Sequence, residues 1–413
     1  MNLLDGSAIE RIVANGLDSL PLSDQRVLVI IPDRTRTMPL PLFFRLIMKY
    51  LRPRAHAVDF LVALGTHPPL GDEALLHLVG LTVEEKAARY PDVRLLNHAW
   101  NDPQALTTIG TIPTSEIAQL SNGLLRQEVP VRLNRLILDY DHLLVCGPVF
   151  PHEVVGFSGG NKYFFPGIAG ADIIDFTHWL GALITSYAMI GAKDTPVRRV
   201  IDRAASFIPR PRHALCSVIT HEGIAGLFFG TPEEAFSAAA DLSAQTHIRY
   251  VEKPYRQVLS VLPEMYEEIW VGAKGMYKME PVVADSGEVI LYAPHIKEIS
   301  AVHGALIQQI GYHVRDYFVK QWDRFKHLPW GVLAHSTHLR GIGTYNAERG
   351  IESPRIQVTL ATGIPRAVCE QIHLGYRDPA GIDPSEWAAR SDPNVLVVPK
   401  AGEYLYRLKA TAR

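Results

Sequence analysis

The sequence has few cysteines and no surplus of charge of either sign. Its 413 residues include 3 cysteines, Cys146, Cys216 and Cys369, and none of them belongs to a CxxC pair. Isolated cysteines argue against a disulfide framework or a cysteine-based metal site and are typical of buried thiols in a reducing compartment. The formal net charge is −2, so bulk electrostatics favour neither nucleic acid nor an anionic membrane as a partner.

Long hydrophobic runs and the common nucleotide-binding fingerprints are also missing. No segment approaches the roughly 20 apolar residues of a membrane helix, and the opening MNLLDGSAIERIVANG lacks the pattern of a secretory signal. We therefore expect a soluble, cytoplasmic protein. Neither the Walker pattern nor GxGxxG occurs, so any ligand must be recognised through other residues.

What the sequence does contain is a series of short apolar runs that end in polar residues. The runs in RVLVIIPDRTR, AVDFLVALGTH and HLLVCGPVFPHE lead into Asp33, Arg36, His67 and His152. Strands this uniformly apolar are buried on both faces, which predicts a parallel sheet covered by helices. Ligands of such sheets bind beyond the carboxyl ends of the strands. We therefore expect these four residues at one shared edge.

The second half of the chain repeats the pattern after a charged, proline-containing joint at residues 251–254. Its strand-like runs are QVLSVLPEM, GEVILYAP, RIQVTLATGIP and NVLVVPK, and residues 301–326 have helical spacing. We predict an α/β protein of two α/β domains with parallel-rich sheets. The predicted domains are residues 1–252 and 253–413, and the last strand, at 395–399, could belong to either of them.

One segment, PHEVVGFSGGNKYFFPGIAGADIIDFTH, carries the most specific pattern. Lys162 follows His152 by ten residues, and His178 follows Lys162 by sixteen. The Ser-Gly-Gly turn is either an anion-binding turn with exposed N–H groups or a simple tight turn. Lys162 is either a solvated surface lysine or a partly desolvated amine of the kind used in covalent attachment. His178 is a core histidine, a general base or a metal ligand.

Other polar residues can be grouped by the chemistry they offer. His67 and His152, each at the end of a strand pattern, form a possible acid–base pair, one for each face of an inverting carbon. Arg36 and Lys274 are candidate anchors for an anion, because arginine can hold a carboxylate with two hydrogen bonds. Each of these residues also has a structural alternative: a histidine can serve only packing, and an arginine or lysine can be solvated at the surface.

The chain resembles the lactate racemase family that uses the nickel-pincer nucleotide. The resemblance rests on PHxxxGFSGGxK with a histidine sixteen residues beyond the lysine, and on DxTR and GxH earlier in the same order. It extends from about Asp33 to the AKGM segment at residues 273–276. It implies two α/β domains with the site in the cleft between them, in agreement with the organisation predicted above.

The resemblance also implies roles for individual residues. Lys162 would be joined through a thioamide to the cofactor, a pyridinium-3-thioamide-5-thiocarboxylic acid mononucleotide, and His178 would be the protein ligand to nickel. His67 and His152 match the acid–base histidines. The other matching positions are Arg36 and Lys274, on the substrate carboxylate, and Asp33, Thr35, Ser158, Gly159 and Gly160, beside the nucleotide.

Three positions depart from the pattern of lactate racemases. Pro68 stands where those proteins usually have arginine, Thr37 where they have proline, and Val271 where they have glutamine. All three lie at or near the substrate side in the family. The departures leave the cofactor residues intact, and we expect a substrate other than lactate.

The sequence therefore predicts an isomerase, a racemase or epimerase that inverts C2 of a small 2-hydroxy acid by hydride transfer. Its partners would include the proteins that synthesise the cofactor, so a chain produced without them can lack it. Nucleic acid and membranes are not expected partners, and the oligomeric state is open. The alternatives are an NAD-dependent oxidoreductase and a non-catalytic homologue that binds a nucleotide or nickel.

Overall fold

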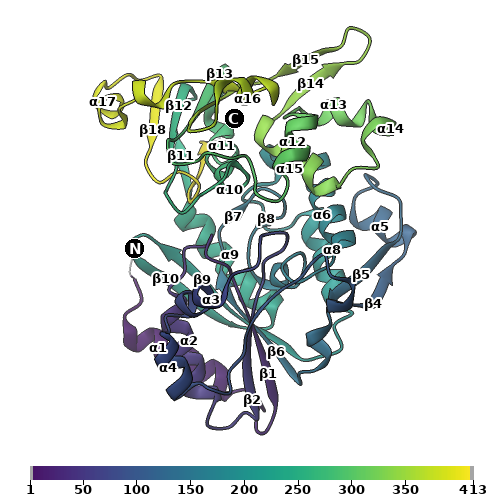
Figure 1. Cartoon of the computed structure of the whole chain (residues 1–413), viewed down its shortest axis with the longest axis vertical. Helices are drawn as coiled ribbons and strands as arrows, with labels where there is room; N and C mark the ends of the chain where they lie inside the picture. Colours follow the sequence, from purple (N-terminus) through teal and green to yellow (C-terminus); the bar gives the residue numbers. More distant parts are fainter. Residues whose placement is uncertain (1–2, 410–413) are drawn as a thin grey trace. The chain divides into compact units, whose positions relative to one another are not determined.

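The computed structural model describes residues 3–409 (Figure 1). These residues form two compact units, each considered separately. The first unit comprises the chain up to Phe150 together with Ser158–Ile174 and Pro196–Thr246. The second comprises Pro151–Phe157, Asp175–Thr195 and the chain from His247 onward. The units are not separated by a single cut, and the domain boundary at residues 252 and 253 stays a prediction.

The first unit is built on a six-stranded sheet with the order β10-β9-β6-β1-β2-β3. All neighbouring strands are parallel except β10, which runs antiparallel to β9. The predicted parallel sheet is therefore confirmed. The strands are β1 (Arg26–Ile31), β2 (Ala57–Val62), β3 (Leu95–Asn97), β6 (His142–Pro148), β9 (Arg212–Thr220) and β10 (Gly223–Gly230).

The apolar side chains of β1 explain why this strand is central. Val27, Val29 and Ile31 pack in one core cluster with the buried sides of α1 and α2, and the alternate residues Leu28 and Ile30 are also fully buried. Side chains alternate between the two faces of a strand, so the sheet is covered on both faces. The helices of this unit are α1 (Gly6–Asp18), α2 (Leu40–Leu51), α3 (Asp72–Val79), α4 (Val83–Arg89), α5 (Thr114–Leu120), α8 (Pro196–Ala205) and α9 (Pro232–His247). A separate antiparallel pair joins β4 (Leu106–Ile112) to β5 (Val129–Asn134).

The strand order of the first sheet reverses at β1. From β1 the chain moves outward to β2 and β3, and it then returns to place β6 on the other side of β1. Connections that leave a sheet in opposite directions open a crevice beyond the carboxyl ends of the two central strands. The loops after β1, β2 and β6 therefore start at the edge where an α/β protein binds its ligand.

The second unit contains a five-stranded sheet in which every neighbouring pair is parallel, with the order β17-β16-β13-β12-β18. The four strands predicted for this half of the chain are all present, and the strand near residue 395 lies in this sheet. Its strands are β12 (Tyr255–Val261), β13 (Val283–Ala293), β16 (Gln357–Thr362), β17 (Gly375–Tyr376) and β18 (Val395–Val398). The strand order again reverses, here at β12. A separate pair joins β11 (Ile248–Val251) to β19 (Leu405–Leu408).

The helical stretch predicted over residues 301–326 is broken in the structure. It forms α12 (Gly304–Ile310), α13 (Arg315–Val319) and α14 (Trp322–Phe325). Gly311, with a φ of 78°, ends α12, and the Tyr312 N–H donates to the Ile372 carbonyl instead of continuing the helix. Within residues 3–409, no helix combines the length and apolar character needed to cross a membrane.

Glu280 is a fully buried ionisable residue of the second unit, with 0% of its surface exposed. Its Oε1 atom accepts the N–H of Ile342 at 2.8 Å, and its Oε2 atom has no hydrogen-bond partner in the described part of the chain. Burial raises the pKa of Glu280 to about 7, although the Ile342 N–H and the Arg355 guanidinium oppose the shift. The folded protein therefore holds this proton more tightly than the unfolded chain does.

We expect Glu280→Gln to change how stability depends on pH. Because the folded pKa is raised, the carboxyl group contributes stability below its unfolded value of 4.5, and this contribution is lost as pH rises to about 7. The free energy of unfolding of the wild type, relative to the variant, should fall by on the order of 3 kcal/mol between pH 4.5 and 8. Urea unfolding measures this difference. Asp285→Asn, which changes an exposed acid paired with Arg355, is the control, and identical pH profiles for the wild type and Glu280→Gln would refute the assignment.

Candidate active site

The loop after β1 is held in shape by hydrogen bonds among its own residues. Asp33, only 5% exposed, accepts at Oδ1 from the N–H of Thr35 at 3.0 Å and from its hydroxyl at 2.6 Å. Arg36 donates to the Thr35 Oγ1 atom at 3.1 Å, and its guanidinium lies 5.6 Å from the centre of the Phe150 ring. The loop therefore presents an arginine of restricted orientation at the edge of the sheet.

The second carboxylate oxygen of Asp33 contacts Nδ1 of His67, on the loop after β2. Burial alone would raise the pKa of Asp33, but His67, Arg36 and the Thr35 hydroxyl outweigh it and hold the pKa well below its ordinary value. A carboxylate that binds Nδ1 fixes the ring orientation and leaves Nε2 to face a ligand. Asp33 was predicted beside the nucleotide, and its pairing with His67 was not foreseen.

The glycine turn is a 3₁₀ turn, η3 (Gly160–Tyr163), and does not start an α-helix. The Ser158 N–H donates to the Phe150 carbonyl at 2.9 Å. Its hydroxyl donates to the Pro148 carbonyl and accepts the Phe150 N–H, each at 3.0 Å. The N–H of Ser158 is therefore used inside the protein, and Ser158 ties the turn to the end of β6.

Both glycines of the turn occupy positions that a side chain would not fit. Gly159 has a φ of 93°, and a Cβ there would lie 2.4 Å from the Val149 side chain. Gly160 has a φ of 57°, and its Cβ would lie 2.8 Å from the Pro232 carbonyl oxygen. Tight packing under the turn fixes the backbone that carries Lys162, whose own side chain is half-buried.

In the second unit, His152 lies on β7 (Pro151–His152), which pairs with β8 (Gly156–Phe157). The residue is 5% exposed. Its Nδ1 atom accepts the Val154 N–H at 3.1 Å and lies 3.3 Å from a carboxylate oxygen of Glu153. An Nδ1 atom that accepts a hydrogen bond leaves the proton of the neutral ring on Nε2. The Nε2 atom of His152 can therefore donate a hydrogen bond to a ligand.

His178 is half-buried on α6 (Ala171–Ile184), and it interacts electrostatically with His335 and His338 of α15 (Trp330–Arg340). Burial lowers the pKa of His338 to about 4, against the attraction of Glu153. Burial also lowers the pKa of His335 well below its ordinary value. Both α15 histidines are therefore neutral near pH 7. Neither of them would repel a cation bound to His178. Across residues 3–409, no group of three or more His, Cys, Asp or Glu residues is arranged to hold a metal ion.

Lys274 begins α11 (Lys274–Tyr277) and is 8% exposed. Its Nζ atom lies 4.7 Å from the centre of the Tyr266 ring. Val271, on the preceding α10 (Ile269–Gly272), is 7% exposed. A buried lysine stacked on an aromatic ring is positioned more narrowly than a surface lysine.

The predicted site residues thus fall into two sets. The first unit brings together Asp33, Thr35, Arg36 and His67, and it also holds Ser158, Gly159, Gly160 and Lys162 on the turn after β8. The second unit holds His152, His178 and Lys274. The cleft between domains stays a prediction. All three cysteines are buried and form no disulfide, as predicted.

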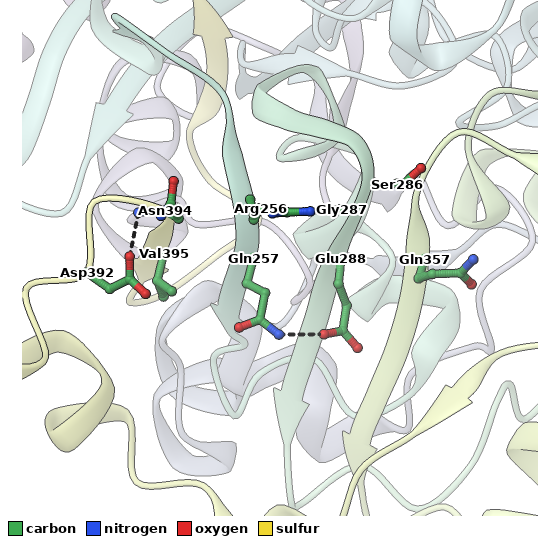
Figure 2. A pocket seen from close by; sticks show the side chains of 9 residues that line it. All are labelled: Arg256, Gln257, Ser286, Gly287, Glu288, Gln357, Asp392, Asn394 and Val395. Atoms are coloured by element: carbon green, nitrogen blue, oxygen red, sulfur yellow. Dashed lines mark hydrogen bonds between the residues drawn. The ribbon is translucent and has the colours of Figure 1, made fainter.

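A separate pocket of about 490 Å³ lies at the amino-end edge of the second sheet, around the first residues of β12, β16 and β18 and residues 286–288 of β13 (Figure 2). Gln257 and Glu288 on its wall are hydrogen-bonded to each other at 2.9 Å. None of the predicted site residues lines it. Parallel sheets bind ligands at their carboxyl ends, so we do not assign the candidate site to this pocket.

Residues 6–191 match the family model described as the lactate racemase N-terminal domain. The chain is 24% identical over 309 residues to the lactate racemase of Thermoanaerobacterium thermosaccharolyticum, a match that covers 71% of this chain and 66% of that protein. The chain thus spans slightly less than two thirds of that relative.

Two solved structures are similar over nearly the whole chain. A protein from Thermotoga maritima is 32% identical with a TM-score of 0.89, covering 99% of this chain and 100% of that one. The lactate racemase apoprotein from T. thermosaccharolyticum has a TM-score of 0.73 at 20% identity, covering 96% of this chain and 92% of that one. The second likeness concerns the fold.

These matches and the two parallel-rich sheets define an α/β protein with the fold of the lactate racemase apoprotein. Residues 6–191 belong to the family of the lactate racemase N-terminal domain.

We expect Gly160→Ala to destabilise the protein more than Gly65→Ala. The two glycines have nearly the same φ, 57° and 56°, but a Cβ at Gly65 would meet no atom within 4 Å. An alanine with a left-handed backbone should lower the free energy of unfolding of either variant by about 1–2 kcal/mol. At Gly160 alone, the clash of the new methyl group should lower it by about 1–3 kcal/mol more. Denaturant unfolding measures both values. Equal losses would show that the turn has room for a side chain.

Proposed function

We propose that this protein is a racemase or epimerase that inverts C2 of a 2-hydroxy acid, with a nickel-pincer nucleotide joined to Lys162. The observation that carries the proposal is the Asp33–His67 pair, with Arg36 on the same loop as the aspartate. An oriented base and a carboxylate anchor at one sheet edge are what a 2-hydroxy acid requires. The match of residues 6–191 to the lactate racemase N-terminal domain and the similarity to a lactate racemase support the same reaction class.

The residues present fit the proposed cofactor. Lys162 is a half-buried amine on a turn whose glycines exclude side chains, which suits a covalent tether. His178 is half-buried beside neutral histidines, which suits a single protein ligand to nickel. When bound, the cofactor would supply an acceptor and donor of hydride for the substrate carbon. The family resemblance assigns Asp33, Thr35, Gly159 and Gly160 to its neighbourhood.

The protein's own residues would handle the substrate and its proton. Arg36 and Lys274 would hold the carboxylate, a positioning role in which an error of about 1 Å can cost on the order of 100-fold in rate. His67 would take the hydroxyl proton at Nε2, and the Asp33 carboxylate would stabilise the resulting imidazolium. His152, as an imidazolium, would supply the proton to the oxygen of the inverted product, and the two histidines would exchange these roles in the reverse direction.

The NAD-dependent alternative has no support from the site. The loop after β1, where a dinucleotide fold carries its glycines, is filled by Asp33, Thr35 and Arg36 and their mutual hydrogen bonds.

We propose the cofactor-synthesis proteins as the partners that load this chain.

Lys162→Ala is expected to carry no covalent cofactor and to have no activity, because the tether needs an amine at this position. The intact mass of denatured protein, produced together with the cofactor-synthesis enzymes, measures the attachment. Lys49→Ala, at an exposed lysine, should be loaded like the wild type. Cofactor mass on the Lys162 variant would refute the assignment.

His67→Ala and His152→Ala are each expected to lower racemisation by roughly 100-fold or more, the usual contribution of a positioned acid–base group, in both directions. Asp33→Asn should act in the same direction as His67→Ala because it removes the carboxylate that orients the ring. Asp59→Asn changes a buried aspartate that binds Arg94 and Tyr140 and is the matched control. Chiral chromatography on loaded protein measures the rates, and near-normal rates would mark the histidine concerned as structural.

We expect a 2-hydroxy acid with a longer aliphatic or aromatic side chain to be converted more efficiently than lactate. Pro68 and Val271 replace polar residues, and an apolar contact is worth about 1–3 kcal/mol per methylene in a fitted pocket. Racemisation over a panel of 2-hydroxy acids tests the preference. Highest efficiency for lactate or for a polyhydroxylated acid would overturn this inference while leaving the reaction class in place.

A further inference from the structure

The turn that carries Lys162 is clamped from the protein interior by the preceding residue, Asn161. Asn161 is 1% exposed. Its Nδ2 atom donates to Oδ1 of Asp202, on α8, at 3.0 Å and to Oε1 of Glu233, on α9, at 2.7 Å. One amide therefore links the turn to two helices through two carboxylates. Hydrogen bonds to charged acceptors are stronger than neutral ones.

Two arginines surround this clamp. Arg198, on α8, donates to the Gly159 carbonyl at 3.1 Å, and its guanidinium lies 3.8 Å from the centre of the Phe236 ring. Arg212 donates to Oε1 of Glu233 at 3.4 Å. Two acids and two arginines thus balance each other's charge beneath the turn. None of the four charged side chains, nor that of Asn161, has a role in the proposed reaction.

The composition of the clamp favours a positioning role over a purely stabilising one. The Oδ1 atom of Asn161 is buried without a hydrogen-bond partner in the described part of the chain, and a buried unsatisfied carbonyl is costly. The main-chain carbonyl of Asn161 accepts from the N–H groups of Phe164 and Phe165, both at 3.0 Å. The side chain of Asn161 therefore attaches the turn to two helices, and its main-chain carbonyl accepts the hydrogen bonds inside the turn.

We propose that Asn161 is a positioning residue for Lys162, which it holds in the orientation needed for cofactor attachment by binding Asp202 and Glu233. This inference rests on the proposed function, because Lys162 matters only if it is the tether. A lysine whose backbone is fixed in this way loses less conformational freedom on attachment than one on a mobile loop.

Asn161→Asp tests the proposal, because it keeps the shape of the side chain and replaces both donors with a third carboxylate. The variant and the wild type are produced together with the cofactor-synthesis enzymes, and the cofactor-bearing fraction of folded protein is read from the intact mass. We expect that fraction to fall by roughly tenfold or more, the effect of losing hydrogen bonds to charged acceptors. Asn161→Asp combined with Asp202→Asn restores a donor between the two positions and should recover loading several-fold.

A matched variant separates positioning from stability. Val13→Ala leaves a cavity at a fully buried position of α1 and should lower the melting temperature without lowering the loaded fraction. Normal loading of Asn161→Asp, or an equal loss in Val13→Ala, would overturn the proposal. So would a failure of the double variant to recover loading.

Hydrogen exchange on cofactor-free protein distinguishes this proposal from the proposed function. The amides of Phe164 and Phe165 should exchange faster by roughly tenfold in Asn161→Asp and remain unchanged in Val13→Ala. A wild type without cofactor mass would refute attachment at Lys162, and the exchange rates would still show whether Asn161 fixes the turn. Unchanged exchange in Asn161→Asp would refute the positioning role by itself.

Discussion

In the first unit, β1 has parallel neighbours on both sides, β2 and β6, and the position of the candidate site depends on this arrangement. Because parallel strands end at the same edge, the loops that follow β1 and β2 start next to each other. Asp33 and His67 lie on these two loops, and their contact is possible only when both strands are in register. A strand shifted by one residue would turn its side chains to the other face.

The Asp33–His67 contact then determines what the site can do. A buried carboxylate is costly unless it is paired, and Asp33 is paired with His67 and Thr35 and lies beside Arg36. The same contacts that allow the charge to be buried also orient the imidazole and restrict the arginine. Stability and orientation therefore have a common cause in this loop.

Much of the fold could be predicted from the sequence because uniformly apolar runs are typical of strands buried on both faces. Those runs located β1, β2 and β6, and their carboxyl ends pointed to Asp33, Arg36 and His67. The pairing of Asp33 with His67 depends on strand order, which the runs do not encode. The division of residues 301–326 into three helices depends on a hydrogen bond from Tyr312 to the distant Ile372.

The hydrogen bonds of the glycine turn could not be predicted from the sequence either. Its motif located Lys162, but the partners of its polar groups lie far away in the sequence. Ser158 binds the end of β6, and Asn161 binds two helices. A local pattern could not reveal that these groups point inward, since each partner is brought close only by the folded sheet and its helices.

In the proposed reaction, the histidines exchange only the hydroxyl proton of the substrate, while the hydrogen on C2 moves as hydride. Racemisation of a single enantiomer by cofactor-loaded protein in D₂O distinguishes this reaction from the removal of a proton from C2. We expect the inverted product to retain its original hydrogen at C2, as read by mass spectrometry and proton NMR. Deuterium at C2 of the inverted product would refute the proposed reaction, because it would show that a base removes a proton from carbon.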